Sequence, residues 1–166
     1  EEDCKKWHEG AKDACELVSA NFYEKAKKKC DEYFFIPHRK EHRGIGGIFY
    51  EKQRFDQIEE GLHFSNKVSE QFIDNYLEII NKHKNTKYSE VEEKFQRFRR
   101  GRYVEFNLTY DRGTLFGLQS SGRIESILMS LPNKVEWHYK FDEKLSTEQK
   151  KLYDVLKTPK DWVHDI

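Results

Sequence analysis

The sequence predicts an α+β domain in which helices pack on an antiparallel sheet. Three segments alternate apolar and polar residues with the period of a half-buried strand, and short turn signals lie between two of them. Several longer segments have helical periodicity instead. At 166 residues the chain is long enough for one domain that buries roughly 70% of the surface of its unfolded form. We therefore expect a single domain over residues 1–166.

The predicted sheet centres on residues 102–119. Apolar side chains occupy alternate positions over 102–110, which is typical of a strand with one buried face. Asp111-Arg112-Gly113 supplies turn residues, and a second strand is expected over 114–119 before another turn at 120–122. The alternation over 134–141 predicts a third strand.

Helices are expected on either side of this sheet region. Apolar residues recur at helical spacing over 3–18, over 21–36 and over 55–83. The last segment fits one long helix or two helices that meet near Gly61. Residues 123–131 fit a strand or a helix, and their pattern does not decide between the two.

Two further helices are predicted from their first residues. Ser89 and Glu92 have the spacing of a capping box, and the helix that they begin is expected to end near Gly101. Ser146 and Gln149 have the same spacing at the start of a closing helix.

The composition restricts the classes of function. Basic and acidic residues balance at thirty each, so any attraction to nucleic acid must be local. No apolar run approaches the roughly 20 residues of a membrane span. The three cysteines include no C-x-x-C pair, which argues against a disulfide framework or a structural zinc site and favours a reducing compartment. The first residues have neither the basic start nor the apolar core of a signal peptide.

Arginines and glycines beside the predicted sheet are the candidate binding residues. Arg112 and Arg123 lie at or next to turns, where a guanidinium is well placed to bind a carboxylate or phosphate. Glycines over 44–47 lie in a β-prone segment and would let a flat ligand or another backbone approach closely. Together these features indicate a site for a flat polyanion.

Two other functions, nucleic-acid binding by the basic residues and zinc binding by the histidines, are not favoured by the sequence. The arginines of 97–102 complement the negative end of a helix dipole, and nucleic acid is not expected as a partner because the net charge is zero. His38 and His42 are four residues apart but lack the H-E-x-x-H pattern of a catalytic zinc helix.

Several stretches, in one collinear order, resemble the oxygen-dependent coproporphyrinogen III oxidase family. They are YFFIPHR at 33–39, RGIGGIF at 43–49, RRGRYVEFN at 99–107, YDRGT at 110–114, RIESILMSLP at 123–132 and PKDWV at 159–163. The similarity covers essentially the whole chain.

The resemblance implies an oxidative decarboxylase of haem biosynthesis. Two propionates of coproporphyrinogen III become vinyl groups, giving protoporphyrinogen IX, with molecular oxygen as co-substrate and carbon dioxide and hydrogen peroxide as products. It implies a large, flat antiparallel sheet between helices on both faces, a homodimer and no organic cofactor, while a divalent metal is disputed. A cytoplasmic location is expected, with the mitochondrial intermembrane space or a plastid as alternatives.

The resemblance also assigns site residues. Arg43 and Arg112 correspond to propionate-binding arginines, and Ser121, Gly122 and Arg123 to part of a substrate-binding turn. His8 and His38 match histidines proposed as metal ligands, although we favour a structural or substrate-side role for them. The segment from residue 103 onward resembles the part of the family that is tied to dimerisation.

The family enzymes are nearly twice as long as this chain. The resemblance therefore predicts that the chain corresponds to the carboxy-terminal half of the enzyme and that the catalytic residues lie on an amino-terminal segment needed for activity. The alternative is a non-catalytic tetrapyrrole-binding or dimerisation module.

Overall fold

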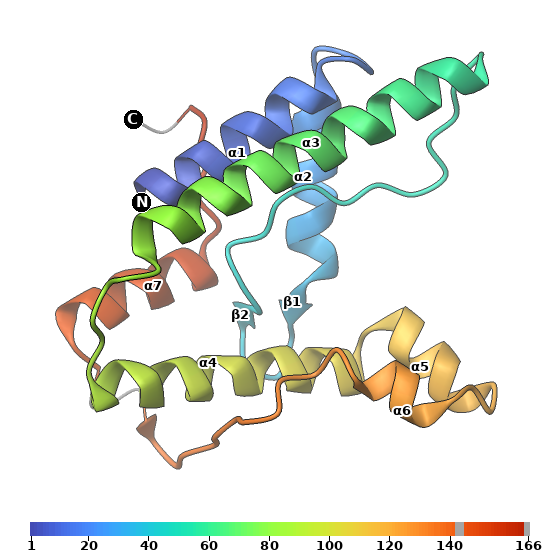
Figure 1. Cartoon of the computed structure of the whole chain (residues 1–166). Helices are drawn as coiled ribbons and strands as arrows, with labels where there is room; N and C mark the ends of the chain where they lie inside the picture. The colour runs from blue at the N-terminus through green and yellow to red at the C-terminus, as the bar shows by residue number, and fades with distance from the viewer. Residues whose placement is uncertain (142–144, 165–166) are drawn as a thin grey trace. The chain divides into compact units, whose positions relative to one another are not determined.

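The computed structural model describes residues 1–141 and 145–164, and most of these residues are helical. The helices are α1 (Glu2–Cys15), α2 (Phe22–Tyr33), α3 (Ile58–His83), α4 (Glu90–Thr109), α5 (Arg112–Gln119), α6 (Ile124–Leu128) and α7 (Thr147–Lys157), shown in Figure 1. Among the described residues the sheet has two strands, β1 (Phe35–Ile36) and β2 (Glu41–His42). The strands are antiparallel and pair Phe35 with His42 and Ile36 with Glu41.

The chain divides into two compact units. The first contains residues 1–33 and 45–86 and the segment that begins at Pro159, and the second contains residues 34–44 together with the described part of 87–158. Across residues 1–141 and 145–164, no helix combines the length and the apolar composition required to cross a membrane.

The first unit is built on the packing of α1 against α3. Gly10 of α1 faces Asn75 of α3, and a Cβ at position 10 would collide with the Asn75 amide, so glycine permits this close approach. The core beside these helices consists of buried side chains from α1, α2 and α3, namely Cys15, Phe22, Tyr23, Ala26 and Phe64. The backbone N–H of Phe49 donates to the carbonyl of Ala26 at 3.0 Å, which ties the glycine-rich segment to α2.

The second unit is organised along α4. Phe98 and Phe106 of this helix are buried, and Phe141 stacks on Phe98 with 4.2 Å between ring centroids. His42 of β2 is hydrogen-bonded through Nδ1 to the carbonyl of Leu156 at 2.8 Å, which fastens α7 to the small sheet.

The helices predicted over 3–18, 21–36 and 55–83 and after Ser146 are present, whereas the helix that begins after Ser89 does not end near Gly101 but continues to Thr109. Ser89 and Ser146 each accept a hydrogen bond from the third helical residue, Glu92 and Gln149, and both predicted capping boxes are complete. The segment over 55–83 forms one helix, α3, and does not break at Gly61. Residues 123–131, for which strand and helix were both open, contain the short helix α6.

The three predicted strands are wrong. Residues 102–109 continue α4, residues 114–119 belong to α5, and residues 134–141 contain no strand. Within 102–110 the alternate positions do not share a face, because Phe106 is buried whereas Leu108 is 44% exposed. The burial of Phe98, Arg102 and Phe106 instead follows the four-residue spacing of a helix face.

The turn predicted at Asp111-Arg112-Gly113 is also replaced by helix. The Asp111 carboxylate accepts a hydrogen bond from the backbone N–H of Thr114 at 2.8 Å and caps α5. Aspartate is favoured both in turns and at the N-cap of a helix, and Asp111 here acts as an N-cap. The turn predicted at 120–122 is present, and Ser121 adopts a left-handed backbone with φ of 60°.

Candidate functional site

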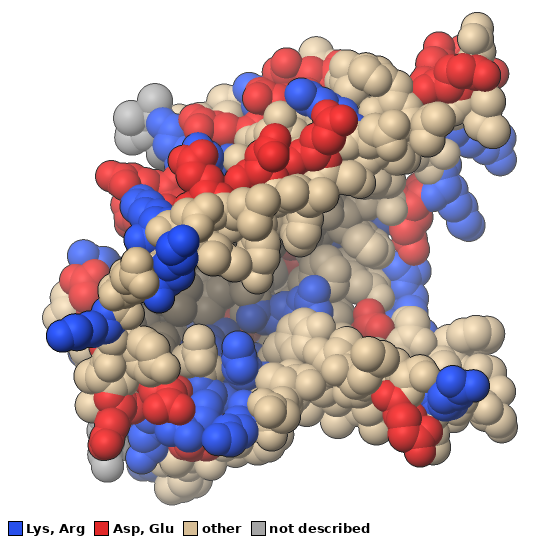
Figure 2. All heavy atoms as spheres, viewed as in Figure 1, with Lys and Arg blue, Asp and Glu red and all other residues tan. Residues whose placement is uncertain are grey.

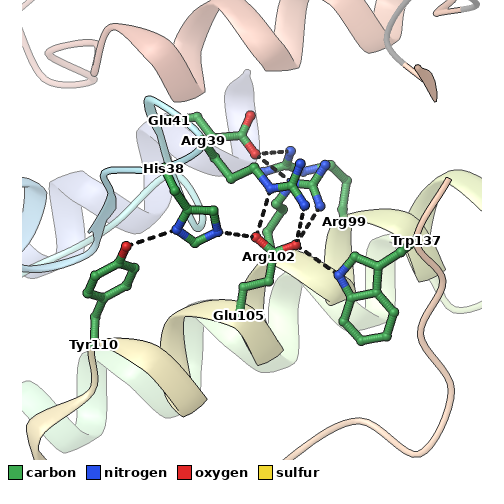
Figure 3. A network of polar contacts seen from close by, with 8 residues as sticks. All are labelled: His38, Arg39, Glu41, Arg99, Arg102, Glu105, Tyr110 and Trp137. Atoms are coloured by element: carbon green, nitrogen blue, oxygen red, sulfur yellow. Dashed lines mark hydrogen bonds and ion pairs between the residues drawn. The ribbon is translucent and has the colours of Figure 1, made fainter. Parts of the chain in front are cut away.

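A dense network of polar side chains joins the segment around β2 to α4 in the second unit. Figure 3 shows its members pointing toward one another: His38, Arg39, Glu41, Arg99, Arg102, Glu105, Tyr110 and Trp137. Most of these side chains come from two places in the sequence. Residues 38–41 form the turn between β1 and β2 and the start of β2, and residues 99–110 form the second half of α4 and its C-cap.

Glu105 is the centre of this network. Arg39 binds both carboxylate oxygens, with Nε 2.8 Å from Oε2 and Nη2 2.7 Å from Oε1. Trp137 Nε1 donates to Oε1 at 2.8 Å and Arg102 Nη1 donates to the same oxygen at 3.0 Å. Burial acts to raise the pKa of Glu105, but the hydrogen bonds from Arg39, His38 and Trp137 and the charge of Arg102 outweigh it and lower this pKa to about 2.

Glu41 is the second carboxylate of the network. It is 3% exposed and accepts hydrogen bonds at Oε1 from Arg99 Nη1 at 2.8 Å and from Arg102 Nε at 3.0 Å. Arg102, itself 5% exposed, therefore lies between two carboxylates and stacks over the ring of Phe98 at 4.4 Å. The three arginines outnumber the two glutamates, which leaves the cluster with one excess positive charge.

His38 connects this buried cluster to a more exposed phenol. Its Nε2 lies 2.8 Å from Glu105 Oε2 and its Nδ1 lies 2.9 Å from the hydroxyl of Tyr110. The His38 and Tyr110 rings are stacked, with 5.7 Å between their centroids. Both ring nitrogens of His38 are thus engaged by neighbouring side chains.

Arg43, predicted to bind a propionate, lies among aromatic rings of the same unit. Its guanidinium carbon is 4.0 Å from the ring centroid of Phe34, 4.9 Å from that of Tyr103 and 5.1 Å from that of Phe106. The backbone N–H of Arg43 donates to the carbonyl of Phe34 at 3.1 Å, which fixes the chain beside β1. Attraction between the cation and these ring faces holds the guanidinium of Arg43 in place.

The other predicted substrate residues lie on the hairpin formed by α5 and α6. Arg112 is the first residue of α5 and Arg123 is the N-cap of α6, and both are exposed. Ser121 and Gly122 form the turn between the helices, where the N–H of Gly122 donates to the carbonyl of Gly117 at 3.1 Å. A Cβ at position 122 would lie 2.9 Å from that carbonyl oxygen, so glycine is required there.

A family model described as coproporphyrinogen III oxidase matches residues 1–162. The chain belongs to the coproporphyrinogen III oxidase family. The resemblance of its motifs to this family is thereby confirmed, and the family is one of oxidases in tetrapyrrole biosynthesis.

His8, one of the two histidines that the family resemblance links to a metal, is completely buried in the first unit. Its Nδ1 lies 2.9 Å from the hydroxyl of Tyr23, and its ring stacks on Trp162. Burial and the charge of Lys27 lower the pKa of His8 to about 4, so the ring is neutral at neutral pH.

The described residues do not fit a metal centre. Within 1–141 and 145–164 there is no group of three or more histidine, cysteine or carboxylate side chains arranged to hold an ion. The nitrogens of His38 are taken by Tyr110 and Glu105, and His8 Nδ1 is taken by Tyr23. Metal binding by His8 and His38 stays a prediction of the family resemblance.

Sequence reasoning missed most of the polar network. His38 was singled out, and Arg99 and Arg102 were considered only as part of the basic cluster over 97–102, whereas Glu41, Glu105 and Tyr110 were not assigned a role. One signal was available, because Arg102 and Glu105 are three residues apart and such pairs meet on a helix. That signal was hidden by the strand prediction, which placed the two residues on opposite faces.

Proposed function

We propose that this chain takes part in the oxygen-dependent oxidative decarboxylation of coproporphyrinogen III to protoporphyrinogen IX. The observation that carries the proposal is the match of the coproporphyrinogen III oxidase family model to residues 1–162. In this reaction two propionates each lose carbon dioxide, two electrons and two protons and become vinyl groups. For each propionate, one molecule of oxygen takes up the two electrons and two protons to form hydrogen peroxide, so two molecules of oxygen are consumed in all.

The side chains of the α5–α6 hairpin are suited to a flat polyanionic substrate. Its two arginines, Arg112 and Arg123, lie near apolar side chains that are largely exposed, with exposed fractions of 72% for Phe116, 55% for Ile124 and 79% for Met129. A tetrapyrrole combines an apolar face with peripheral carboxylates, and the hairpin combines exposed apolar side chains with cations. Figure 2 shows its visible face as mostly uncharged, with basic and acidic groups at separate places. A guanidinium binds a carboxylate through charge-assisted hydrogen bonds, which gives such a ligand a defined orientation.

Further parts of the proposal follow the family resemblance. We propose a homodimer in the cytoplasm, no organic cofactor, and a chain that forms one portion of a larger domain with a flat sheet covered by helices on both faces. Residues outside this chain are proposed to supply catalytic groups. Because this chain could bind coproporphyrinogen III without converting it, binding of this ligand and product formation are to be measured separately.

The proposed reaction is tested by incubating the protein, together with any chain that copurifies with it, with coproporphyrinogen III under oxygen and under argon. We expect carbon dioxide and hydrogen peroxide to be released only under oxygen, and addition of a chelator tests the need for a metal. Tight anaerobic binding without any product under oxygen would favour the non-catalytic tetrapyrrole-binding module instead. Absence of both binding and product would overturn the proposal.

Replacement of Arg112 by alanine is expected to weaken anaerobic binding of coproporphyrinogen III about 10- to 150-fold, because one charge-assisted hydrogen bond contributes about 1.5–3 kcal/mol. Arg54→Ala is the matched control, since Arg54 is an exposed arginine of the first unit. Calorimetric titration of both variants measures the effect. An Arg112→Ala variant with wild-type affinity would remove Arg112 from the binding site.

A further inference from the structure

The long helix α3 carries apolar side chains on two sides, and the described residues of the chain cover only one of them. The covered side includes Phe64 and Val68, which pack in the core of the first unit. The uncovered side, which we call the α3 stripe, follows the three- and four-residue spacing of one helix face. It consists of Ile58, Leu62, Ser65, Ser69, Phe72, Ile73, Tyr76, Leu77 and Ile80.

The area of the α3 stripe is that of a stable protein interface. Its large side chains are between 38% and 83% exposed. Side chains of this size and exposure present together on the order of 800 Å², and each partner of a standard interface buries about 800 Å². The stripe is continuous over residues 58–80, which is about 33 Å of helix. Contiguous apolar patches of this extent mark interaction sites rather than scattered surface residues.

The polar residues in the middle of the stripe are suited to burial. Ser65 Oγ donates to the carbonyl of Gly61 at 2.8 Å, and Ser69 Oγ donates to the carbonyl of Ser65 at 2.9 Å. Because both hydroxyl hydrogens are used within the helix, covering these serines leaves no donor without a partner. Their small side chains also let a second helix approach α3 closely at this point.

The two ends of the stripe have complementary shapes. A groove of about 700 Å³ opens beside the first turns of α3. Gly61 lets the ring of Phe55 lie against the helix there, since a Cβ at position 61 would be 3.1 Å from that ring. At the other end Phe72 and Tyr76 form a ridge, with their rings stacked at 5.9 Å between centroids and the edge of Phe72 held by Trp7 at 5.4 Å. One end can therefore receive apolar side chains, and the other can insert them.

We propose that two copies of this chain associate through the α3 stripe, with their α3 helices antiparallel and a two-fold axis at Ser69. This residue lies midway between Ile58 and Ile80. Antiparallel pairing about it sets Ile58 opposite Ile80 of the second copy and Leu62 opposite Tyr76 of the second copy. The ridge of each copy then enters the groove of the other, and the two-fold axis uses this complementary pair of surfaces twice.

The proposed interface rests on the homodimer of the proposed function and gives it a surface. That surface lies in the first unit, whereas the family resemblance points to the segment from residue 103 onward. The oligomeric state is measured without substrate, so the result does not depend on the proposed reaction.

Ser69→Glu tests the position of the axis by sedimentation equilibrium, because each copy brings a glutamate to the same point. Ser69 is exposed and glutamate is a good helix former, so the fold should tolerate the change. We expect the wild-type protein to have twice the mass of one 20.1 kDa chain. Ser69→Glu is expected to raise the Kd of the dimer about 100-fold, since like charges that meet in an interface are strongly unfavourable. His63→Glu adds the same charge at an exposed position of α3 outside the stripe and should leave the Kd unchanged.

Ser69→Lys separates charge repulsion from misfolding. Alone it should dimerise as weakly as Ser69→Glu, because two lysines then meet at the axis. An equimolar mixture of the two variants should dimerise more tightly than either variant alone, since opposite charges face each other in the mixed dimer. A mixture that stays as monomeric as its components would overturn the proposed axis.

Two further outcomes would overturn the proposed interface. A Ser69→Glu variant that dimerises like the wild type would place the contact elsewhere, and the homodimer would stand. A monomeric wild-type protein would overturn the interface and the homodimer together, because the stripe would then be covered within the chain or by a different protein. The proposed decarboxylation stands in both cases, since product formation tests it separately.

Discussion

Replacing Glu105 with glutamine is expected to lower the free energy of unfolding by about 3–5 kcal/mol, the range found when one partner of a buried charge pair is removed. The Glu105 side chain is 12% exposed and that of Arg102 is 6% exposed. A glutamine would keep one acceptor oxygen and present an NH2 group in place of the other. Because Arg39 donates to both oxygens of Glu105, that NH2 group would face a donor of Arg39 whichever oxygen is replaced. Arg102 would keep Glu41 as its only carboxylate contact in the network (Figure 3).

Urea unfolding followed by far-ultraviolet circular dichroism measures this effect. Glu148→Gln is the control, because Glu148 is a 79% exposed residue of α7 whose pairing with Lys151 is worth well under about 1 kcal/mol. The wild-type protein should also lose more stability than Glu105→Gln as the pH falls from 4.5 toward 2, since the pKa of Glu105 is lowered in the folded protein and the variant lacks that contribution. Equal stabilities of the two variants would show that the donors around Glu105 find other partners.

The burial of His8 is expected to make the first unit sensitive to mild acid. Its pKa is lowered from 6.5 to about 4 on folding, so the unfolded chain binds the proton more readily than the folded one. The contribution of neutral His8 to the free energy of unfolding is therefore complete above pH 6.5 and is lost as the pH falls toward 4. Between pH 7 and pH 5 the expected loss from this residue is about 2 kcal/mol.

The contribution of His8 is isolated by comparing pH dependences. His8→Phe keeps a ring against Trp162 and removes the titrating group, so its stability should fall less than that of the wild type between pH 7 and pH 5. It should start lower, because the buried hydroxyl of Tyr23 loses its partner. His63→Asn, a change of an exposed histidine of α3, should retain the wild-type dependence. A wild-type dependence in His8→Phe would assign the acid sensitivity to other groups.

Helix starts were predictable because they depend on a few adjacent residues. Ser89 and Ser146 each need only a glutamate or glutamine three positions later, and both capping boxes formed as the spacing required. The strands were not predictable in the same way. An alternating segment of nine residues also contains pairs four apart, and burial of Arg102 and Phe106 on one face satisfied that second pattern.

The residues of the candidate site likewise differ in whether the local sequence could reveal them. Arginines beside predicted turns were visible in the sequence. Arg123 does follow the turn at 120–122, whereas Arg112 is the first residue of helix α5 and not part of a turn. The network around Glu105 was not visible, because its contacts join residues up to 72 positions apart and depend on a helix that alternation concealed. Buried charges are rare unless paired, and only the fold reveals which partners are within reach.

The α5–α6 hairpin has a consequence for how tightly any ligand is held there. Neither helix contains a buried residue, so little apolar contact opposes local opening of the segment over 112–128. A ligand that bridges Arg112 and Arg123 would order the hairpin, and the conformational entropy lost in that ordering reduces its affinity. Anything that stiffens the hairpin beforehand would strengthen binding at the proposed site without touching the ligand, so the rigidity of this segment would affect the affinity as well as its arginines.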